Sequence, residues 1–194
     1  MSSNNWHYLF KIIYRAVAYW RGFFLYVTIK LCGGICEGIP RVGKLVTFKY
    51  PPHPGIRIGR NCDIGPCSYF DVPKTGILNI GNNVKLTAGV VVSAINEVTI
   101  GDNSLIAEWV SIRDAQHLFK LGESINSQGL SKGNIWIGRD VWIGRGSAVF
   151  LNAHLEDGCI LAANSIVKEK RLSSNKIYVG VPAREIAVRP GDED

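Results

Sequence analysis

The sequence predicts an all-β fold: a parallel β-helix of hexapeptide repeats, with an N-terminal amphipathic α-helix and one long loop excursion. Three observations carry this prediction. Aliphatic residues recur every six positions, a small or β-branched residue stands four positions after each of them, and the 194 residues include 21 glycines but one methionine. A six-residue period differs from the helical period of roughly 3.6 residues and from the alternation of one long strand. It is typical of a β-helix, whose coils bury their inward residues against one another.

The repeats are clearest in residues 137–167. The aliphatic residues are expected to fill the interior, and the small residues four positions later are expected to fit the tighter corners. Glycine directly after an aliphatic residue permits the backbone angles of a corner. The large inward positions are Ile137, Ile143, Val149, Leu155, Leu161 and Val167, and the small ones are Val141, Ser147, Ala153, Cys159 and Ser165.

Residues 1–55 precede the repeats and divide into a helix and a connector with three prolines. The helix is expected over residues 6–32, with its basic residues on one side and apolar and aromatic residues on the other. No charge-free run in it approaches the roughly twenty residues of a spanning helix. Two readings stay open: the helix lies in a membrane interface, or it packs on the β-helix and closes its open end. The basic residues are Lys11, Arg15, Arg21 and Lys30.

Residues 56–184 are assigned to the β-helix, with an interruption at residues 118–136. Repeats begin at Ile58, and three of them make one coil of roughly 18 residues, so the chain should hold roughly five coils. Long loops of this kind inside a regular scaffold are usually functional. Residues 185–194 are assigned to a C-terminal tail, of which the acidic residues 190–194 are expected to be disordered.

The net charge and the cysteines indicate the class of binding partner and the cellular compartment. With 22 basic and 16 acidic residues the net charge is +6, which favours an anionic partner. No long basic run points to nucleic acid. Among the five cysteines, Cys62 and Cys159 occupy small inward positions, and free buried thiols together with the lack of a signal peptide indicate a reducing, cytoplasmic compartment.

His117 is the strongest candidate for chemistry because it stands at the end of a coil, where the long loop begins. An accessible histidine can act as a base near neutral pH. Asp114, three residues earlier, could orient or polarise its ring. On pattern alone, a lone loop histidine is more often an ordinary surface residue, and His7, His53 and His154 are weaker candidates.

Four motifs and His117 together resemble the hexapeptide-repeat acyltransferases, in particular the maltose and galactoside O-acetyltransferase branch and its relatives in lipopolysaccharide, capsule and exopolysaccharide synthesis. The matching segments are residues 100–103 (IGDN), 137–144 (IGRDVWIG), 161–167 (LAANSIV) and 179–184 (VGVPAR). The resemblance extends over residues 58–184.

This resemblance implies a left-handed β-helix that forms a homotrimer and binds acetyl-coenzyme A (acetyl-CoA) in the groove between subunits, without a metal. His117 matches the family's catalytic base, which takes the proton of an acceptor hydroxyl during direct transfer. Trp142 matches a tryptophan near the active site, and Ala163 matches the position whose backbone meets the pantetheine arm. Lys168 and Arg184 are candidates for the coenzyme's phosphates. The chain departs from the family at Arg145, where a small or polar residue is common; the arginine would either add a phosphate contact or narrow the groove.

The resemblance therefore implies an acetyl-CoA-dependent O-acetyltransferase acting on a sugar of a bacterial surface polysaccharide or its precursor. It would work in the cytoplasm, with a peripheral position on the inner face of the membrane if residues 6–32 bind lipid. One alternative is N-acetyl transfer to an amino sugar or amino acid. A non-enzymatic scaffold, or a zinc protein that would need three well-placed histidines, is the other.

Overall fold

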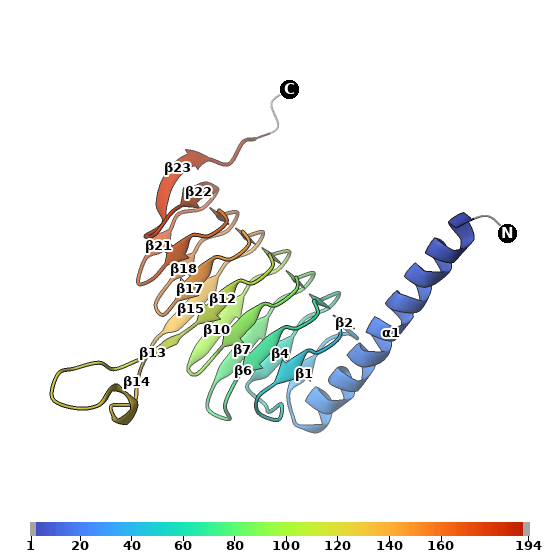
Figure 1. Cartoon of the computed structure of the whole chain (residues 1–194), viewed down its shortest axis with the longest axis horizontal. Helices are drawn as coiled ribbons and strands as arrows, with labels where there is room; N and C mark the ends of the chain where they lie inside the picture. The colour runs from blue at the N-terminus through green and yellow to red at the C-terminus, as the bar shows by residue number, and fades with distance from the viewer. Residues whose placement is uncertain (1–2, 192–194) are drawn as a thin grey trace.

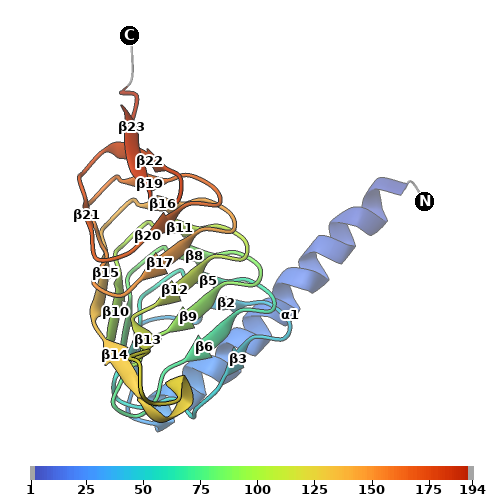
Figure 2. The same ribbon diagram turned by 60° about the vertical axis from the view of Figure 1, so that its left-hand side comes forward.

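The computed structural model describes residues 3–191, with side chains described from Trp6 onward. The chain winds into a three-sided prism of stacked coils, with a long helix at its N-terminal end and one ribbon projecting from an edge (Figure 1). Each coil except the last supplies one short strand to each of three parallel sheets, called here faces A, B and C. Figure 2 shows the strands of faces B and C stacked in register along the prism. The predicted parallel β-helix is confirmed.

The strands of each face follow one another from coil to coil. Face A contains β1 (Ile35–Cys36), β4 (Ile56–Ile58), β7 (Ile77–Ile80), β10 (Glu97–Ile100), β15 (Asn134–Ile137), β18 (His154–Leu155) and β21 (Arg171–Leu172). Face B contains β2 (Arg41–Val42), β5 (Asp63–Ile64), β8 (Lys85–Leu86), β11 (Leu105–Ile106), β16 (Trp142–Ile143), β19 (Ile160–Leu161), β22 (Lys176–Val179) and, antiparallel to β22, β23 (Arg184–Val188). Face C contains β3 (Thr47–Phe48), β6 (Tyr69–Asp71), β9 (Val91–Ser93), β12 (Ser111–Arg113), β17 (Ala148–Phe150) and β20 (Ile166–Val167).

The interior follows the predicted six-residue register. Every large inward position of residues 137–167 is buried, and so is every small one. On face B, Ile143 stacks between Ile106 of the coil before and Leu161 of the coil after. Each buried aliphatic side chain therefore contacts its equivalents above and below, which is why the repeats are stable only in series.

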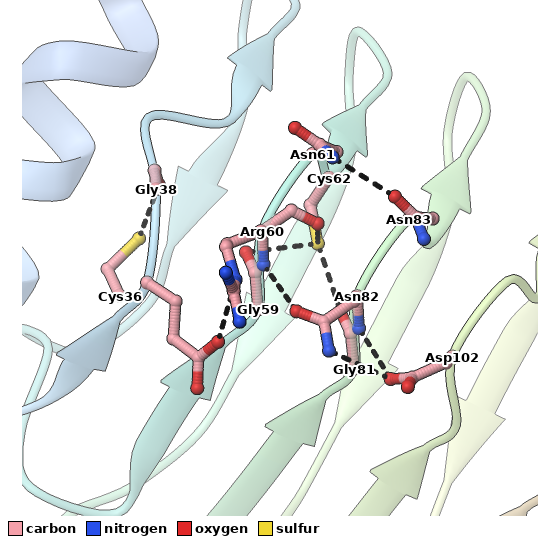
Figure 3. Close-up of polar contacts among 11 residues, drawn as sticks. Cys36, Gly38, Gly59, Arg60, Asn61, Cys62, Gly81, Asn82, Asn83 and Asp102 are labelled. Atoms are coloured by element: carbon pink, nitrogen blue, oxygen red, sulfur yellow. Dashed lines mark hydrogen bonds and ion pairs between the residues drawn. The ribbon is translucent and has the colours of Figure 1, made fainter.

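The corner between faces A and B, called the AB corner, shows how the chain turns. Its turning residues adopt the left-handed backbone conformation, with φ of 55° at Asn83 and 60° at Asn103. This conformation points the backbone N–H of Asn83 at the carbonyl of Arg60, 2.8 Å away in the preceding coil. Asparagine tolerates the conformation well, and its side chains add a ladder. Asn61 donates to Asn83 at 3.2 Å (Figure 3), and Asn83 donates to Asn103 at 2.9 Å.

The β-helix begins one coil earlier than the sequence analysis placed it. The boundary at residue 56 is wrong, because β1, β2 and β3 already form a complete coil from Ile35 to Phe48. The three prolines lie in the corner that follows this coil. There His53 is buried; its Nδ1 accepts the N–H of Gly55 at 3.1 Å, and its Nε2 lies 3.3 Å from the Val72 carbonyl. His53 therefore has a structural role.

The C-terminal boundary is also different from the prediction. Residues 185–188 were assigned to the C-terminal tail, but together with Arg184 they form β23, which pairs with β22. Of residues 190–194, for which disorder is expected, residues 192–194 lie outside the described residues. The last strand of face B is thus covered by an antiparallel neighbour.

Helix α1 (Ser3–Leu31) divides into a packed half and a projecting half. Ala18 and Ile29 are buried, and a Cβ at Gly22 would collide with the carbonyl of Pro40, so this half lies closely against the first coil. Residues 6–17 are exposed on every side, and Figure 1 shows them extending beyond the prism. Within residues 3–191 no helix meets the length and hydropathy needed to cross a bilayer.

The excursion leaves the prism after β12 and returns before β15. It starts as an antiparallel ribbon of β13 (Ala115–His117) and β14 (Leu130–Lys132), and its tip carries a 3-10 turn, η1 (Ile125–Ser127). At the tip, the Gln128 side chain accepts the N–H of Lys120 at 2.7 Å and donates to its carbonyl at 2.8 Å. The predicted loop 118–136 therefore ends too late, because Ile135 and Trp136 belong to β15 of face A.

Candidate active site

His117 ends β13 at the base of the excursion, and its side chain is exposed. Pairing with Leu130 of β14 fixes its backbone. The base of the ribbon is closed by the N–H of Gly133, which donates to the Asp114 carbonyl at 2.8 Å. The structure thus holds an accessible imidazole on a defined backbone just outside the corner between faces C and A, the CA corner.

Asp114 points inward rather than toward His117. The residue is fully buried, and its carboxylate accepts the N–H groups of Ile95 at 2.8 Å and Asn96 at 2.7 Å from the preceding coil. Burial raises the pKa of the Asp114 carboxyl, and those backbone hydrogen bonds oppose the rise. Asp114 therefore fixes the base of the excursion. Within residues 3–191 no hydrogen bond joins Asp114 to His117, so no direct contact supports the expectation that Asp114 orients the His117 ring.

Trp142, Arg145 and Ala163 are brought together by the stacking of two coils. Trp142 lies on face B with its side chain 48% exposed. Arg145 turns the next corner, between faces B and C (the BC corner), and its carbonyl accepts the N–H of Asn164 at 2.8 Å. Ala163 precedes Asn164 and is exposed, so all three residues face solvent, Trp142 on face B and the other two at the BC corner of adjacent coils. A small side chain at position 163 leaves the corner backbone accessible to a ligand.

Lys168 and Arg184 lie near the C-terminal end of the prism. Lys168 follows β20 and forms an ion pair with Glu169 at 3.6 Å. Arg184 starts β23, and the N–H of its neighbour Ala183 donates to the Ile166 carbonyl at 2.8 Å, two residues before Lys168. Both cations therefore lie close to the last coil, on the far side of Ala163 from the excursion.

The sequence-predicted site residues consequently form two groups in one chain. Trp142, Arg145 and Ala163 lie on face B and the BC corner, with Arg184 beyond them at the end of the prism, whereas His117 and, two coils later, Lys168 lie at the CA corner. The chain shows no group of three or more His, Cys, Asp or Glu side chains able to hold a metal ion between residues 3 and 191.

Two further residues have positions that were not predicted from the sequence: one stacks on a neighbouring coil and one turns a corner. His154 stacks on Trp136 of face A, with ring centroids 4.3 Å apart, and burial followed by the nearby Arg171 lowers its pKa. Trp109 turns the BC corner one coil before Arg145, with φ of 62° and 59% of its surface exposed. Counting six-residue steps from Ile106 would have revealed that a bulky residue stands at a corner position here.

Comparison with known sequences agrees with the architecture. A family model described as the hexapeptide repeat of succinyl-transferase matches residues 55–94 and 134–169. A protein of Mycobacterium tuberculosis named as a probable acetyltransferase is 30% identical over 89% of the chain, which spans 57% of that protein's length. WbbJ of Escherichia coli, named for O-acetyl transfer in lipopolysaccharide biosynthesis, is 30% identical over 68% of the chain and 70% of its own length.

A solved structure gives the same fold. AntD, an N-acyltransferase from Bacillus cereus in complex with dTDP and 3-hydroxybutyryl-CoA, superposes with a TM-score of 0.65 at 23% identity. The match includes 84% of this chain and 87% of AntD. The fold is therefore the left-handed β-helix that the resemblance implied.

Proposed function

Because this chain belongs to the hexapeptide-repeat acyltransferase family, we propose that it transfers an acetyl group from acetyl-CoA to a sugar hydroxyl of a surface polysaccharide or its precursor. The predicted family and enzyme class are confirmed. The identity of the donor, the acceptor and the catalytic residues is proposed here. The strongest support for the proposal is the exposed imidazole of His117, which lies at the base of the excursion from an otherwise regular scaffold.

His117 serves as the general base. Its neutral imidazole takes the proton of the acceptor hydroxyl while that oxygen attacks the thioester carbonyl. The C–S bond breaks as the tetrahedral intermediate collapses, and the imidazolium returns its proton to the departing thiolate, giving the acetyl ester and coenzyme A. Much of the acceleration comes from holding hydroxyl and thioester in line, and positioned proton transfer adds about 10²- to 10⁴-fold.

The donor lies along the BC corner. Trp142 and Arg145 contact it, and the Ala163 backbone meets the pantetheine arm. Arg184 pairs with its phosphates, as does Lys168 of the subunit whose CA corner supplies His117. The exposure of Trp142, Arg145 and Ala163 supports this arrangement, as does the acyl-CoA bound by the similarly folded AntD.

The active protein is a homotrimer in which one subunit supplies His117 and its neighbour supplies the BC corner. Support comes from the separation of the two groups in a single chain. Light scattering should give three times the subunit mass of 21.4 kDa. At an acetyl-CoA concentration well below the KM of the wild type, where both variants are slow, mixing His117→Ala and Arg145→Ala chains should give more activity than the mean of the two parents, because some interfaces then contain both intact residues. A mixture no more active than that mean would contradict the shared site.

Helix α1 gives the protein a peripheral position at the cytoplasmic membrane. Its sequence contains no acidic residue, and its projecting half carries exposed Trp6, Phe10 and Ile13 beside Lys11 and Arg15. Such a helix suits an anionic bilayer interface. Deleting residues 1–17 should abolish sedimentation with phosphatidylglycerol vesicles and leave the packed half in place. Unchanged sedimentation would contradict membrane contact. The five free thiols, three of them buried, support a reducing compartment.

N-acetyl transfer to an amino sugar is the second candidate, favoured by the similarity to the N-acyltransferase AntD. The same base could deprotonate an ammonium group.

The decisive experiment is calorimetric titration with acetyl-CoA, followed by a thiol-release assay with methyl glycosides and with glucosamine as acceptors. Binding of one acetyl-CoA per subunit with transfer to glycosides is expected. Transfer to glucosamine alone would favour the amine, and no binding by folded protein would leave a non-enzymatic scaffold.

A further inference from the structure

Trp109 adopts the left-handed backbone conformation, which is unfavourable for a bulky side chain. At the same BC-corner position the preceding coil has Gly89 and the following coils have Gly146 and Asn164, residues that adopt positive φ readily. A bulky residue there costs conformational free energy, and such strain is typical of functional sites. The corner itself does not require it.

The indole lies in a fixed place on the surface. A Cβ at Gly89 would collide with Cε3 of Trp109, so the six-membered ring rests directly on the Gly89 backbone. Gly89 itself is buried, whereas Trp109 is 59% exposed. Trp109 therefore presents a flat, apolar and immobilised surface to solvent, and it adds little to the interior.

Trp109 also lies at a defined end of the proposed donor site. The N–H of Gly146 donates to the Glu108 carbonyl at 2.9 Å, which places Trp109 one coil before Arg145 and two before Ala163 on the same corner. Because Arg184 lies beyond Ala163 at the opposite end, a coenzyme with its phosphates there extends its thioester toward Trp109.

Resting on the proposed function, we propose that Trp109 is a specificity residue that stacks its open indole face on the pyranose ring of the acceptor. The C–H groups on one face of a pyranose are apolar and slightly positive, and the face of an indole is apolar and negative. The adenine of the coenzyme lies at the end with the phosphates, so it is not the partner of this indole.

The test compares three variants in the thiol-release assay with methyl β-galactopyranoside and methyl α-glucopyranoside. Trp109→Asn should raise the KM for the better glycoside about tenfold, as the loss of one aromatic stack predicts, with the KM for acetyl-CoA unchanged. Its Tm should rise, because asparagine tolerates the corner conformation. Trp109→Phe should retain part of the affinity. Leu45→Asn is the matched control: Leu45 has φ of 58° and 73% exposure at the same corner of the first coil, so the Tm should rise without any change in KM.

Saturation-transfer NMR with the same glycosides separates this proposal from the proposed function. Pyranose ring signals that are present in the wild type and lost in Trp109→Asn support the stack even if no acetyl transfer occurs. Unchanged glycoside KM in an active Trp109→Asn enzyme overturns it and leaves the acetyltransferase standing. A Trp109→Asn protein of smaller mass in light scattering, or absent pyranose signals in the wild type, also overturns it.

Discussion

The AB and BC corners solve the same backbone problem with different side chains. At both corners a residue with positive φ donates its N–H to the preceding coil: Asn103 to Asn82 and Trp109 to Ala88, at 2.8 and 3.0 Å. The AB corner uses residues suited to that conformation, namely Asn61, Asn83, Asn103, Asp140, Gly158 and Asn175. The BC corner uses Leu45, Cys67, Gly89, Trp109, Gly146 and Asn164.

Both corners require the same backbone hydrogen bond. The backbone therefore does not explain why the BC corner has side chains that are poorly suited to positive φ. The AB corner carries asparagine ladders that stabilise the stack, whereas the BC corner carries the exposed residues assigned to donor and acceptor. We therefore expect regular positions such as Asn83 to serve stability, and the irregular positions Trp109 and His117 to serve binding and chemistry. The excursion with His117 is the extreme case of an irregular position.

The largest effect is expected from His117. His117→Ala should lower kcat about 10²- to 10⁴-fold, because the positioned base is lost, and Tm should change little because the side chain is exposed. Steady-state thiol release and thermal unfolding measure the two quantities.

His154→Ala is the matched control in a regular coil. It removes the stack on Trp136 and should lower Tm while most of kcat remains. If His154→Ala were the variant that abolished transfer, the division between regular and irregular positions would fail.

A smaller loss, of stability alone, is expected at the AB corner. Asn83→Ala leaves a less suitable residue at positive φ and removes the side-chain bonds to Asn61 and Asn103. The cost should be about 1–3 kcal/mol of unfolding free energy, measured by urea denaturation, with both KM values unchanged. A raised KM for either substrate would show that the AB corner also binds ligand.

Arg145→Ala tests donor binding at the BC corner. Loss of one charge-assisted contact should raise the KM for acetyl-CoA about tenfold, with little change in Tm. Arg139→Ala is the counterpart at the AB corner of the same coil, where Arg139 pairs with Asp157 at 3.2 Å. If the two variants changed the KM for acetyl-CoA equally, the assignment of Arg145 to the donor site would be wrong.

The smallest effect concerns acid stability at the AB side. Hydrogen bonds from Ser174 and then Arg171 lower the pKa of Glu156 from 4.5 to about 2. Since the folded-state pKa is the lower one, this contribution is complete above pH 4.5 and is lost as the pH falls toward 2. Glu156→Gln should therefore show a flatter fall of Tm between pH 4.5 and 2 than the wild type. A curve parallel to that of the wild type would contradict the assignment.

The elements that follow the six-residue period could be predicted from the sequence, whereas the elements that interrupt the period could not. Ile137 to Val167 give a clean period, so their burial could be predicted from spacing alone. Cys36, Val42 and Phe48 keep the same spacing in the first coil, but a cysteine, an aromatic residue and the prolines after them hide it. The position of β23 depends on pairing with β22, a tertiary contact that no local pattern records.

The candidate site shows the same limit. His117 was identifiable because it stands where the period breaks, whereas the inward turn of Asp114 depends on backbone groups of another coil. Trp109 was overlooked because a bulky side chain at a left-handed corner contradicts local preference, and its packing over Gly89 becomes visible only when two coils are stacked.

Both ends of the prism are covered, the last one in part, which has a consequence for how the protein behaves at high concentration. A parallel coil presents unpaired backbone groups on its upper and lower rims, so an uncovered repeat can add further copies without limit. The packed half of α1 covers the first rim, and β23 lies antiparallel along part of the last one. These two segments set the length of the molecule, and without them the same repeat that stabilises the enzyme would template end-to-end polymers.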